Sequence, residues 1–188
     1  MNKINTPLAN KISINSRLIS LESMDFTGKL NLRIKSTDIE AHSKISQFLT
    51  YDLPLKAGGI STNNQSRVAC MGPDEYLIQC PNERKIDFIK NLGETLQGSF
   101  YALTDVSDYY LTIRLSGIKS IDVIQKGCPL NFKEYLNKKD TCAQSYISKA
   151  TVLIDRLADD KVFDILVRWS MAEYLWSWLE DSSLEFSE

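Results

Sequence analysis

Residues 29–35, KLNLRIK, place an apolar side chain at every second position. Leu30, Leu32 and Ile34 therefore point to one face of an extended chain, and the residues between them are polar. This alternation is typical of a β-strand with one buried face. We predict a strand here that packs one side against a core.

An amphipathic helix is predicted directly after this strand. Thr37 and Glu40 have the spacing of a capping box, which would start the helix by satisfying its first free N–H groups. Apolar residues then recur at the interval of one helical face, at Ala41, Ile45, Phe48 and Leu49. The segment 53–66, LPLKAGGISTNNQS, has the composition of a loop.

Two short apolar runs follow, on either side of Gly72-Pro73-Asp74. Proline suits the second position of a tight turn and aspartate tolerates the third, so the sequence predicts a β-hairpin. The adjacent acids Asp74 and Glu75 could instead form a catalytic carboxylate pair. A hairpin tip is usually convex and solvated, and turn chemistry already accounts for both residues, so we favour the turn.

A second helix is predicted from Asn82, as its N-cap, to Gly98. The run 99–107 is the next predicted strand. The order strand, helix, strand, strand, helix, strand is the split βαβ pattern of ferredoxin-like folds. We assign it to a first lobe over residues 25–107.

The same order begins again in a predicted second lobe over residues 108–188. LTIRL at 111–115 repeats the alternation of the first strand, and a helix is predicted from Ser116 to about Gly127. Two strands joined by a turn at 158–161 follow. Ser170 and Glu173 have the spacing of another capping box, before the last helix.

The fold class is therefore α+β, with two tandem ferredoxin-like lobes built on mostly antiparallel sheets. This second lobe lacks a final strand. The N-terminal segment 1–24 is predicted to be partly extended, and Lys11–Leu21 could supply the missing strand, but the sequence does not show that it does.

The last helix carries an unusually broad apolar face, which covers about 200° of its circumference. Its members are Met171, Ala172, Tyr174, Leu175, Trp176, Trp178 and Leu179. Either the helix packs between the two lobes of its own chain, or a partner protein covers part of this face. Trp169, Tyr174, Trp176 and Trp178 are the candidate interface residues.

Composition excludes several classes of function. The net charge of -2 gives no electrostatic reason to expect binding to nucleic acid or to an anionic membrane. No signal peptide and no membrane-spanning run is recognisable, so we expect a cytoplasmic protein. Cys70, Cys80, Cys128 and Cys142 match no zinc pattern, and we expect them to be buried thiols.

No catalytic residue, cofactor-binding motif or metal site is predicted. Neither a G-x-G-x-x-G nor a G-x-x-x-x-G-K-[ST] motif occurs. His42 lies within a predicted helix, where we expect it to be exposed, and Cys128 has no nearby base to activate it. Asp105 and Asp108 are typical of acids that bind backbone N–H groups in turns, although Asp105 could face a ligand cleft.

Several segments, in order, resemble the gamma subunit family of heterotetrameric sarcosine oxidase. They are TPLAN (6–10), LPLKAGG (53–59), GPDEYLIQCP (72–81), LTDVSD (103–108), IRLSG (113–117), KGCPLN (126–131), CAQSYISKATVLI (142–154) and FDILVRWSMAEYLWSWLEDSS (163–183). Two sites depart from the family. Trp169 stands where the family tends to have arginine, which could alter an interface contact, and Asn131 replaces an aspartate, which weakens any role for an acid there.

The resemblance implies a fold related to the folate-binding part of the glycine-cleavage T-protein. It also implies assembly with alpha, beta and delta subunits, chiefly alpha. Such a complex oxidatively demethylates sarcosine to glycine with FAD, FMN and NAD, and passes the one-carbon unit to tetrahydrofolate. The family's gamma chain is not known to carry a cofactor, so the expected function is assembly and stabilisation without catalysis.

Two rival functions stay open. The chain could be a stand-alone folate-binding or one-carbon-transfer protein of the T-protein type, with Asp105 or Asp108 near the ligand. It could also be a regulatory module that binds another small molecule, which the sequence neither supports nor excludes.

Overall fold

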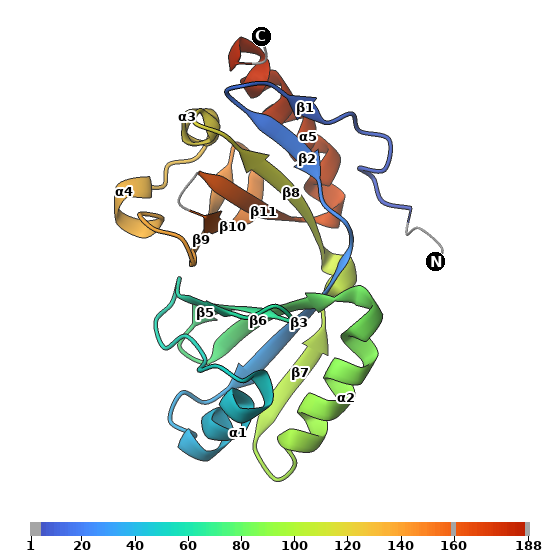
Figure 1. The fold of residues 1–188 in the computed structure, drawn as a ribbon, viewed down its shortest axis with the longest axis vertical. Coiled ribbons are helices and arrows are strands. Elements are labelled where there is room, and N and C mark those ends of the chain that lie inside the picture. Colours follow the sequence, from blue (N-terminus) through green and yellow to red (C-terminus); the bar gives the residue numbers. More distant parts are fainter. Residues whose placement is uncertain (1–4, 159–160, 187–188) are drawn as a thin grey trace. The chain divides into compact units, whose positions relative to one another are not determined.

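The computed structural model describes residues 5–158 and 161–186, which form two compact units (Figure 1). One unit, Thr27–Asp108, is continuous in sequence and is called the contiguous unit. The other combines Met1–Phe26 with Tyr109–Glu188 and is called the split unit. Residues 5–24, which belong to the segment predicted to lie outside both lobes, are thus part of the split unit.

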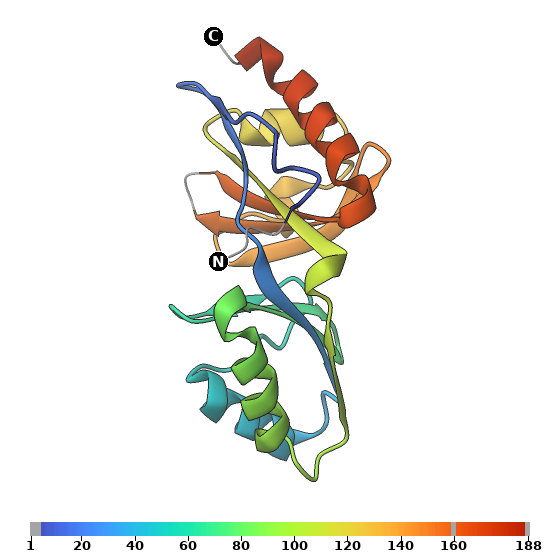
Figure 2. The same cartoon turned by 90° about the vertical axis from the view of Figure 1, so that its right-hand side faces the viewer.

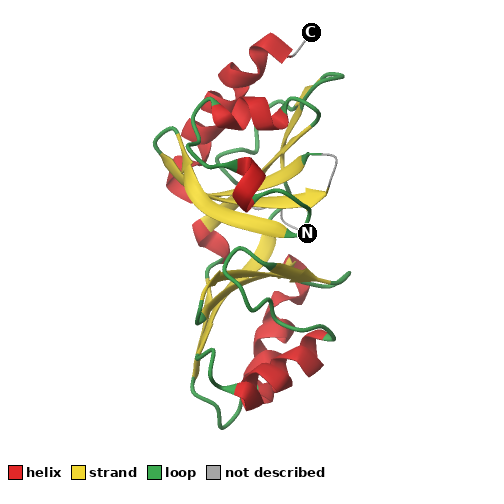
Figure 3. Cartoon of the chain, turned by 90° about the vertical axis from the view of Figure 1, so that its left-hand side faces the viewer, coloured by secondary structure: helices red, strands yellow, loops and turns green. Residues whose placement is uncertain are grey.

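The contiguous unit has the predicted ferredoxin-like connectivity. Its strands lie in the order β4-β5-β6-β3-β7, and all neighbours are antiparallel. Helices α1 and α2 cover one face of this sheet (Figure 3). The elements are β3 (Thr27–Ile34), α1 (Ile39–Leu49), β4 (Ile60–Thr62), β5 (Arg67–Gly72), β6 (Glu75–Pro81), α2 (Lys85–Thr95) and β7 (Tyr101–Asp105).

The apolar alternation of β3 explains the core of this unit. Leu30, Leu32 and Ile34 are all buried, as predicted, because every second side chain of a strand points to the same face. The helices contribute their own apolar faces to the same cluster, namely Ala41, Ile45 and Leu49 of α1 and Leu92 of α2. The predicted loop over 53–66 is partly wrong, because β4 lies within it.

The three predicted helix caps are wrong in detail. Asp38, not Thr37, caps α1, since its carboxylate accepts a hydrogen bond from the Ala41 N–H at 3.0 Å. Asn82 and Ser170 cap no helix, because a 3₁₀ turn precedes each of the helices α2 and α5. Tight i→i+3 hydrogen bonds in such a turn satisfy groups that a side-chain cap would otherwise bind.

The split unit repeats this architecture on a second antiparallel sheet, in the order β1-β2-β8-β11-β10-β9. Helices α3 and α5 lie on one side of it (Figure 2). The predicted turn at 158–161 includes residues 159 and 160, which lie outside the described residues. The elements are β1 (Ile14–Asn15), β2 (Ser20–Ser23), β8 (Tyr110–Ser116), α3 (Ser120–Gln125), α4 (Phe132–Tyr135), β9 (Thr141–Ile147), β10 (Ala150–Ala158), β11 (Val162–Arg168) and α5 (Ala172–Ser183).

The N-terminal segment supplies the strand that the second repeat lacks. β2 pairs antiparallel with β8, from Ser20↔Ser116 to Ser23↔Ile113. The order β10-β11-β8-β2 therefore matches β5-β6-β3-β7 in the contiguous unit, and β9 takes the place of β4. The internal duplication is complete, but the last strand of the second repeat precedes all other strands of both repeats in the sequence.

Gly117 allows the N-terminal segment to lie close to the end of β8. Its φ of +111° is rarely adopted by residues with a side chain. A Cβ atom at this position would collide with the Leu18 carbonyl oxygen, which also accepts a hydrogen bond from the Lys119 N–H at 3.2 Å. The glycine is thus required where the two parts of the split unit meet.

The core of the split unit joins residues from both ends of the sequence. Leu8, Ile19 and Leu21 from the N-terminal segment are buried in the same cluster as Phe163 of β11 and Trp176 of α5. No helix in the described part of the chain is long and apolar enough to span a membrane.

Candidate functional site

Asp74 and Glu75 hold the tip of the predicted hairpin, which the structure confirms. Asp74 accepts a hydrogen bond from the Ser36 N–H at 2.7 Å, and hydrogen bonds from the backbone and side chain of Ser36 lower the pKa of this carboxyl group. Glu75 pairs with Arg33 at 3.1 Å and accepts a bond from Asn31 at 2.7 Å. Both carboxylates are engaged in turn and cross-strand contacts.

The hairpin tip is exposed at Pro73 and Asp74, and it also borders a groove. The tip forms one wall of an open groove of about 480 Å³. The rest of the groove is formed by Arg33 of β3 with Lys35 just beyond it, and by Ala102 of β7 with Phe100 just before it. The residues of the hairpin carry no signal for the neighbouring strand ends, because those are brought beside it by the pairing of β3 with β6 and β7.

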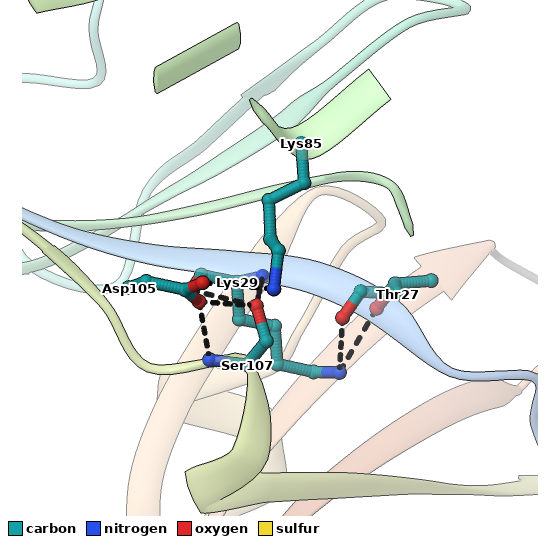
Figure 4. A network of polar contacts seen from close by, with 5 residues as sticks. All are labelled: Thr27, Lys29, Lys85, Asp105 and Ser107. Atoms are coloured by element: carbon teal, nitrogen blue, oxygen red, sulfur yellow. Dashed lines mark hydrogen bonds and ion pairs between the residues drawn. The ribbon is translucent and has the colours of Figure 1, made fainter. Parts of the chain in front are cut away.

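Asp105 belongs to a polar network in the contiguous unit (Figure 4). Its carboxylate pairs with Lys85 Nζ at 2.8 Å and accepts bonds from the Ser107 N–H at 3.0 Å and the Ser107 hydroxyl at 2.5 Å. The Lys29 N–H donates to Ser107 Oγ at 2.9 Å, and Lys29 Nζ donates to Thr27 Oγ1 at 2.9 Å. The network thereby ties the start of β3 to the end of β7 and the start of α2.

Gly28 lets Lys85 reach this network. A Cβ atom at residue 28 would lie 2.9 Å from Cys80 Sγ and 3.1 Å from Cβ and Cγ of Lys85. The lysine stem therefore packs on bare strand backbone while its ammonium group meets Asp105. Asp105 is predictable as a turn acid, but its partners Lys85 and Ser107, and Lys29 beside them, are not, since nothing in their spacing along the sequence brings them together.

The network lowers the pKa of Asp105. Partial burial alone would raise this pKa, but hydrogen bonds from Lys85 and Ser107 and the charge of Lys85 together outweigh it. Because the carboxyl pKa is lower in the folded than in the unfolded protein, its contribution to stability is full above about pH 4 and is lost as pH falls through the folded pKa.

Replacement of Asp105 by asparagine is expected to lower stability at pH 7 by about 1 kcal/mol or less, since the ion pair is partly exposed. Urea unfolding at pH 7 and at pH 3 measures the effect, and the difference from wild type should shrink at pH 3. Asp108→Asn is the matched control, because Asp108 is exposed on the next turn. A deficit of equal size at both pH values would contradict a role for the carboxylate charge.

His42 and the four cysteines are withdrawn from solvent to different degrees. His42 is half-buried rather than exposed as expected, with its ring edge-on to Tyr76 at 6.0 Å between centroids. All four cysteines are buried and form no disulfide, as predicted for structural thiols, and burial raises the pKa of Cys80 to about 11. Within the described ranges, no cluster of three or more His, Cys, Asp or Glu could hold a metal ion.

The four candidate aromatic residues in α5 and in the turn just before it differ in burial. Trp176 is completely buried in the core of the split unit and offers no surface to a partner. The prediction that it is an interface residue is therefore wrong. Trp178 is half-buried and packs over Gly127, where a Cβ atom would lie 2.5 Å from the indole ring. Trp169 is half-buried, and Tyr174 is exposed with its hydroxyl 2.7 Å from Ser148 Oγ.

Comparisons with known proteins agree with this architecture. A model of the sarcosine oxidase gamma subunit family (SoxG) matches residues 33–185. The chain is similar to one in the structure of heterotetrameric sarcosine oxidase from Corynebacterium sp. U-96 in complex with pyrrole 2-carboxylate. The identity is 24%, the match covers 94% of this chain and 89% of that chain, and the TM-score is 0.82.

A second solved structure has the same fold over part of its length. Glycine cleavage system aminomethyltransferase T from Bartonella henselae is 14% identical, with a TM-score of 0.62 over 85% of this chain and 44% of that one. This likeness agrees with the predicted T-protein-like fold. None of the curated protein sequences compared with the chain is significantly similar to it.

Proposed function

The chain belongs to the sarcosine oxidase gamma subunit family, and we propose that it assembles and stabilises the oxidase without taking part in catalysis. The family match over residues 33–185 carries this proposal. The contacts of the contiguous unit support it, because Asp74, Glu75 and Asp105 are engaged in turns and ion pairs. In this proposal the Ser107 hydroxyl and the Lys85 ammonium group that bind Asp105 hold strand and helix ends together.

The partners in this proposal are the alpha, beta and delta subunits, chiefly alpha. FAD, FMN, NAD and tetrahydrofolate would act in those chains, and this chain would hold none of them. We place the complex in the cytoplasm, where a reducing environment suits four buried cysteines that form no disulfide.

Trp169 and Tyr174 are the proposed contact residues on the split unit. Both retain exposed surface beside the core, and aromatic side chains of this kind are frequent anchors at interfaces. Trp178 contributes less in this proposal, because much of its ring already packs on Gly127.

Co-expression with the other three oxidase subunits tests the proposal. We expect this chain to co-purify with them in a complex that carries flavin absorbance, and the complex formed without it to be less stable to heat. A fully active and equally stable complex of the other subunits, with this chain left monomeric, would show that the assignment is wrong.

A titration with a reduced folate distinguishes the T-protein-type rival. The isolated chain is expected not to bind, because the proposal leaves folate chemistry to other subunits. Micromolar binding by the isolated chain, measured by calorimetry, would contradict a purely structural role and support a stand-alone folate-binding protein.

A further inference from the structure

The outer edge of β7 presents a row of backbone groups with no partner strand in the described part of the chain. β7 is the last strand in the order of the contiguous sheet and pairs with β3 on its inner side only. The Val106 N–H donates to the Lys29 carbonyl at 2.9 Å, so the backbone groups of Val106 point toward β3. Along an antiparallel strand, every second residue points its N–H and C=O groups at the neighbouring strand, and the residues between point theirs away from it. The N–H and C=O groups of Tyr101, Leu103 and Asp105 therefore point away from the sheet.

This edge lacks the usual protection against strand addition. Exposed edges are commonly blocked by proline, lysine, a bulge or extreme shortness. The sequence of β7, YALTD, contains no proline or lysine, and its register with β3 is unbroken. Its one charge, Asp105, stands at the end of the strand and pairs with Lys85. Phe100, directly before the strand, is 82% exposed.

The equivalent edge in the other repeat is covered. β2 occupies in the split unit the place that β7 occupies in the contiguous unit. β1 pairs antiparallel with the outer side of β2, through Ile14↔Leu21 and Asn15↔Ser20. The same fold position thus accepts an added strand in one repeat, and in the other it has no added strand among the described residues.

The remaining sheet edges differ from that of β7. β4, at the opposite end of the contiguous sheet, has only three residues. β9 in the split unit is flanked by its own chain, because the Ser148 N–H just beyond it donates to the Gly127 carbonyl at 2.9 Å and Cys128 Sγ lies 3.5 Å from Ser145 Oγ.

We propose that β7 receives an extended segment of another oxidase subunit as an added strand. This inference rests on the proposed function, because the partner is a subunit of the same complex. Main-chain hydrogen bonds from Tyr101, Leu103 and Asp105 would supply the affinity, as in other cases of strand addition.

Charge indicates which segment fits. Arg33 lies opposite Ala102 in the β3–β7 register, and its side chain is 63% exposed. One of its nitrogens binds Glu75 on the other side, but a guanidinium group has five N–H donors. Ala102 is too small to cover this cation. An acidic side chain on the added strand, next to Ala102, would meet Arg33, so the partner segment is extended and carries a carboxylate at that position.

Residue-resolved hydrogen exchange on the free chain and on the assembled complex tests the proposal directly. In the free chain the amides of Ala102 and Thr104, which face β3, should be protected, and those of Tyr101, Leu103 and Asp105 should exchange quickly. In the complex the three outward amides should slow by about tenfold or more, as expected for amides that enter a ladder.

If the complex forms and these three amides exchange as fast as in the free chain, strand addition at β7 is wrong although the proposed function stands. If no complex forms, the proposed function itself fails. The two failures are therefore distinguishable in one experiment.

A pair of variants at Leu103 separates backbone from side-chain effects. Leu103→Ala and Leu103→Pro lose the same half-buried side chain, but only proline removes the outward N–H and fills the edge. We expect association with the other subunits to weaken by about tenfold or more for Leu103→Pro and much less for Leu103→Ala. Equal association of the two folded variants would overturn the proposal, and the exchange experiment decides it if Leu103→Pro does not fold.

Discussion

Deletion of residues 1–23 is expected to unfold the split unit while the contiguous unit keeps its fold. The deleted segment contains β2, which pairs with β8, and three side chains buried in the core, Leu8, Ile19 and Leu21. Full burial of each such side chain stabilises by about 1.5–3 kcal/mol, so their joint loss is comparable with the 5–15 kcal/mol that separates a typical folded domain from its unfolded state.

The contiguous unit should survive, because residues 27–108 include every strand of its sheet and its own core. Amide hydrogen exchange by peptide measures both units at once. Protection should be lost over 110–168 and retained over 27–105. A truncated chain that keeps protection in β8 and β11 would show that the N-terminal strand is dispensable.

Two point variants in the same segment provide a milder form of this test. Leu21→Ala removes a completely buried side chain and is expected to destabilise the split unit by about 2–5 kcal/mol. Ile12→Ala is the matched control, because Ile12 is 82% exposed, and it should have little effect. Equal urea midpoints for the two variants would contradict the assigned position of β2.

The contiguous unit could be predicted from the sequence because its signals are local. β3 alternates over a full strand length, and α1 repeats its apolar residues at helical spacing. The missing strand of the split unit could not be identified in the same way. β2 is four residues long and buries Leu21 as its main core contact, and its partner β8 lies some ninety residues further along the chain.

The candidate site shows the same limit. Asp105 was recognisable as a turn acid from its surroundings, but its ion pair with Lys85 depends on how α2 packs over Gly28. In the last helix, Trp176 and Trp178 belong to one broad apolar face, and composition does not distinguish the side that meets the core. The structure does so through Ala172, Leu175 and Leu179, which share the buried face with Trp176.

Trp176→Ala is expected to destabilise the split unit by about 3–5 kcal/mol, the usual range for a buried tryptophan. Trp176→Phe should cost much less. Phenylalanine keeps most of the apolar volume, and it removes an indole N–H that is buried without a hydrogen-bond partner among the described residues. Urea unfolding of the isolated chain measures both changes.

Trp169→Ala provides the contrast, because Trp169 keeps exposed surface at the margin of the same core. It should lower the stability of the isolated chain less than Trp176→Ala does, yet weaken association with the other oxidase subunits more than Trp176→Phe does. Substitution of a core residue weakens association only by reducing the fraction of the chain that is folded. Substitution of an interface residue weakens association even when the whole sample is folded. If Trp169→Ala leaves association unchanged while Trp176→Phe weakens it, the division of these aromatics between core and interface is wrong.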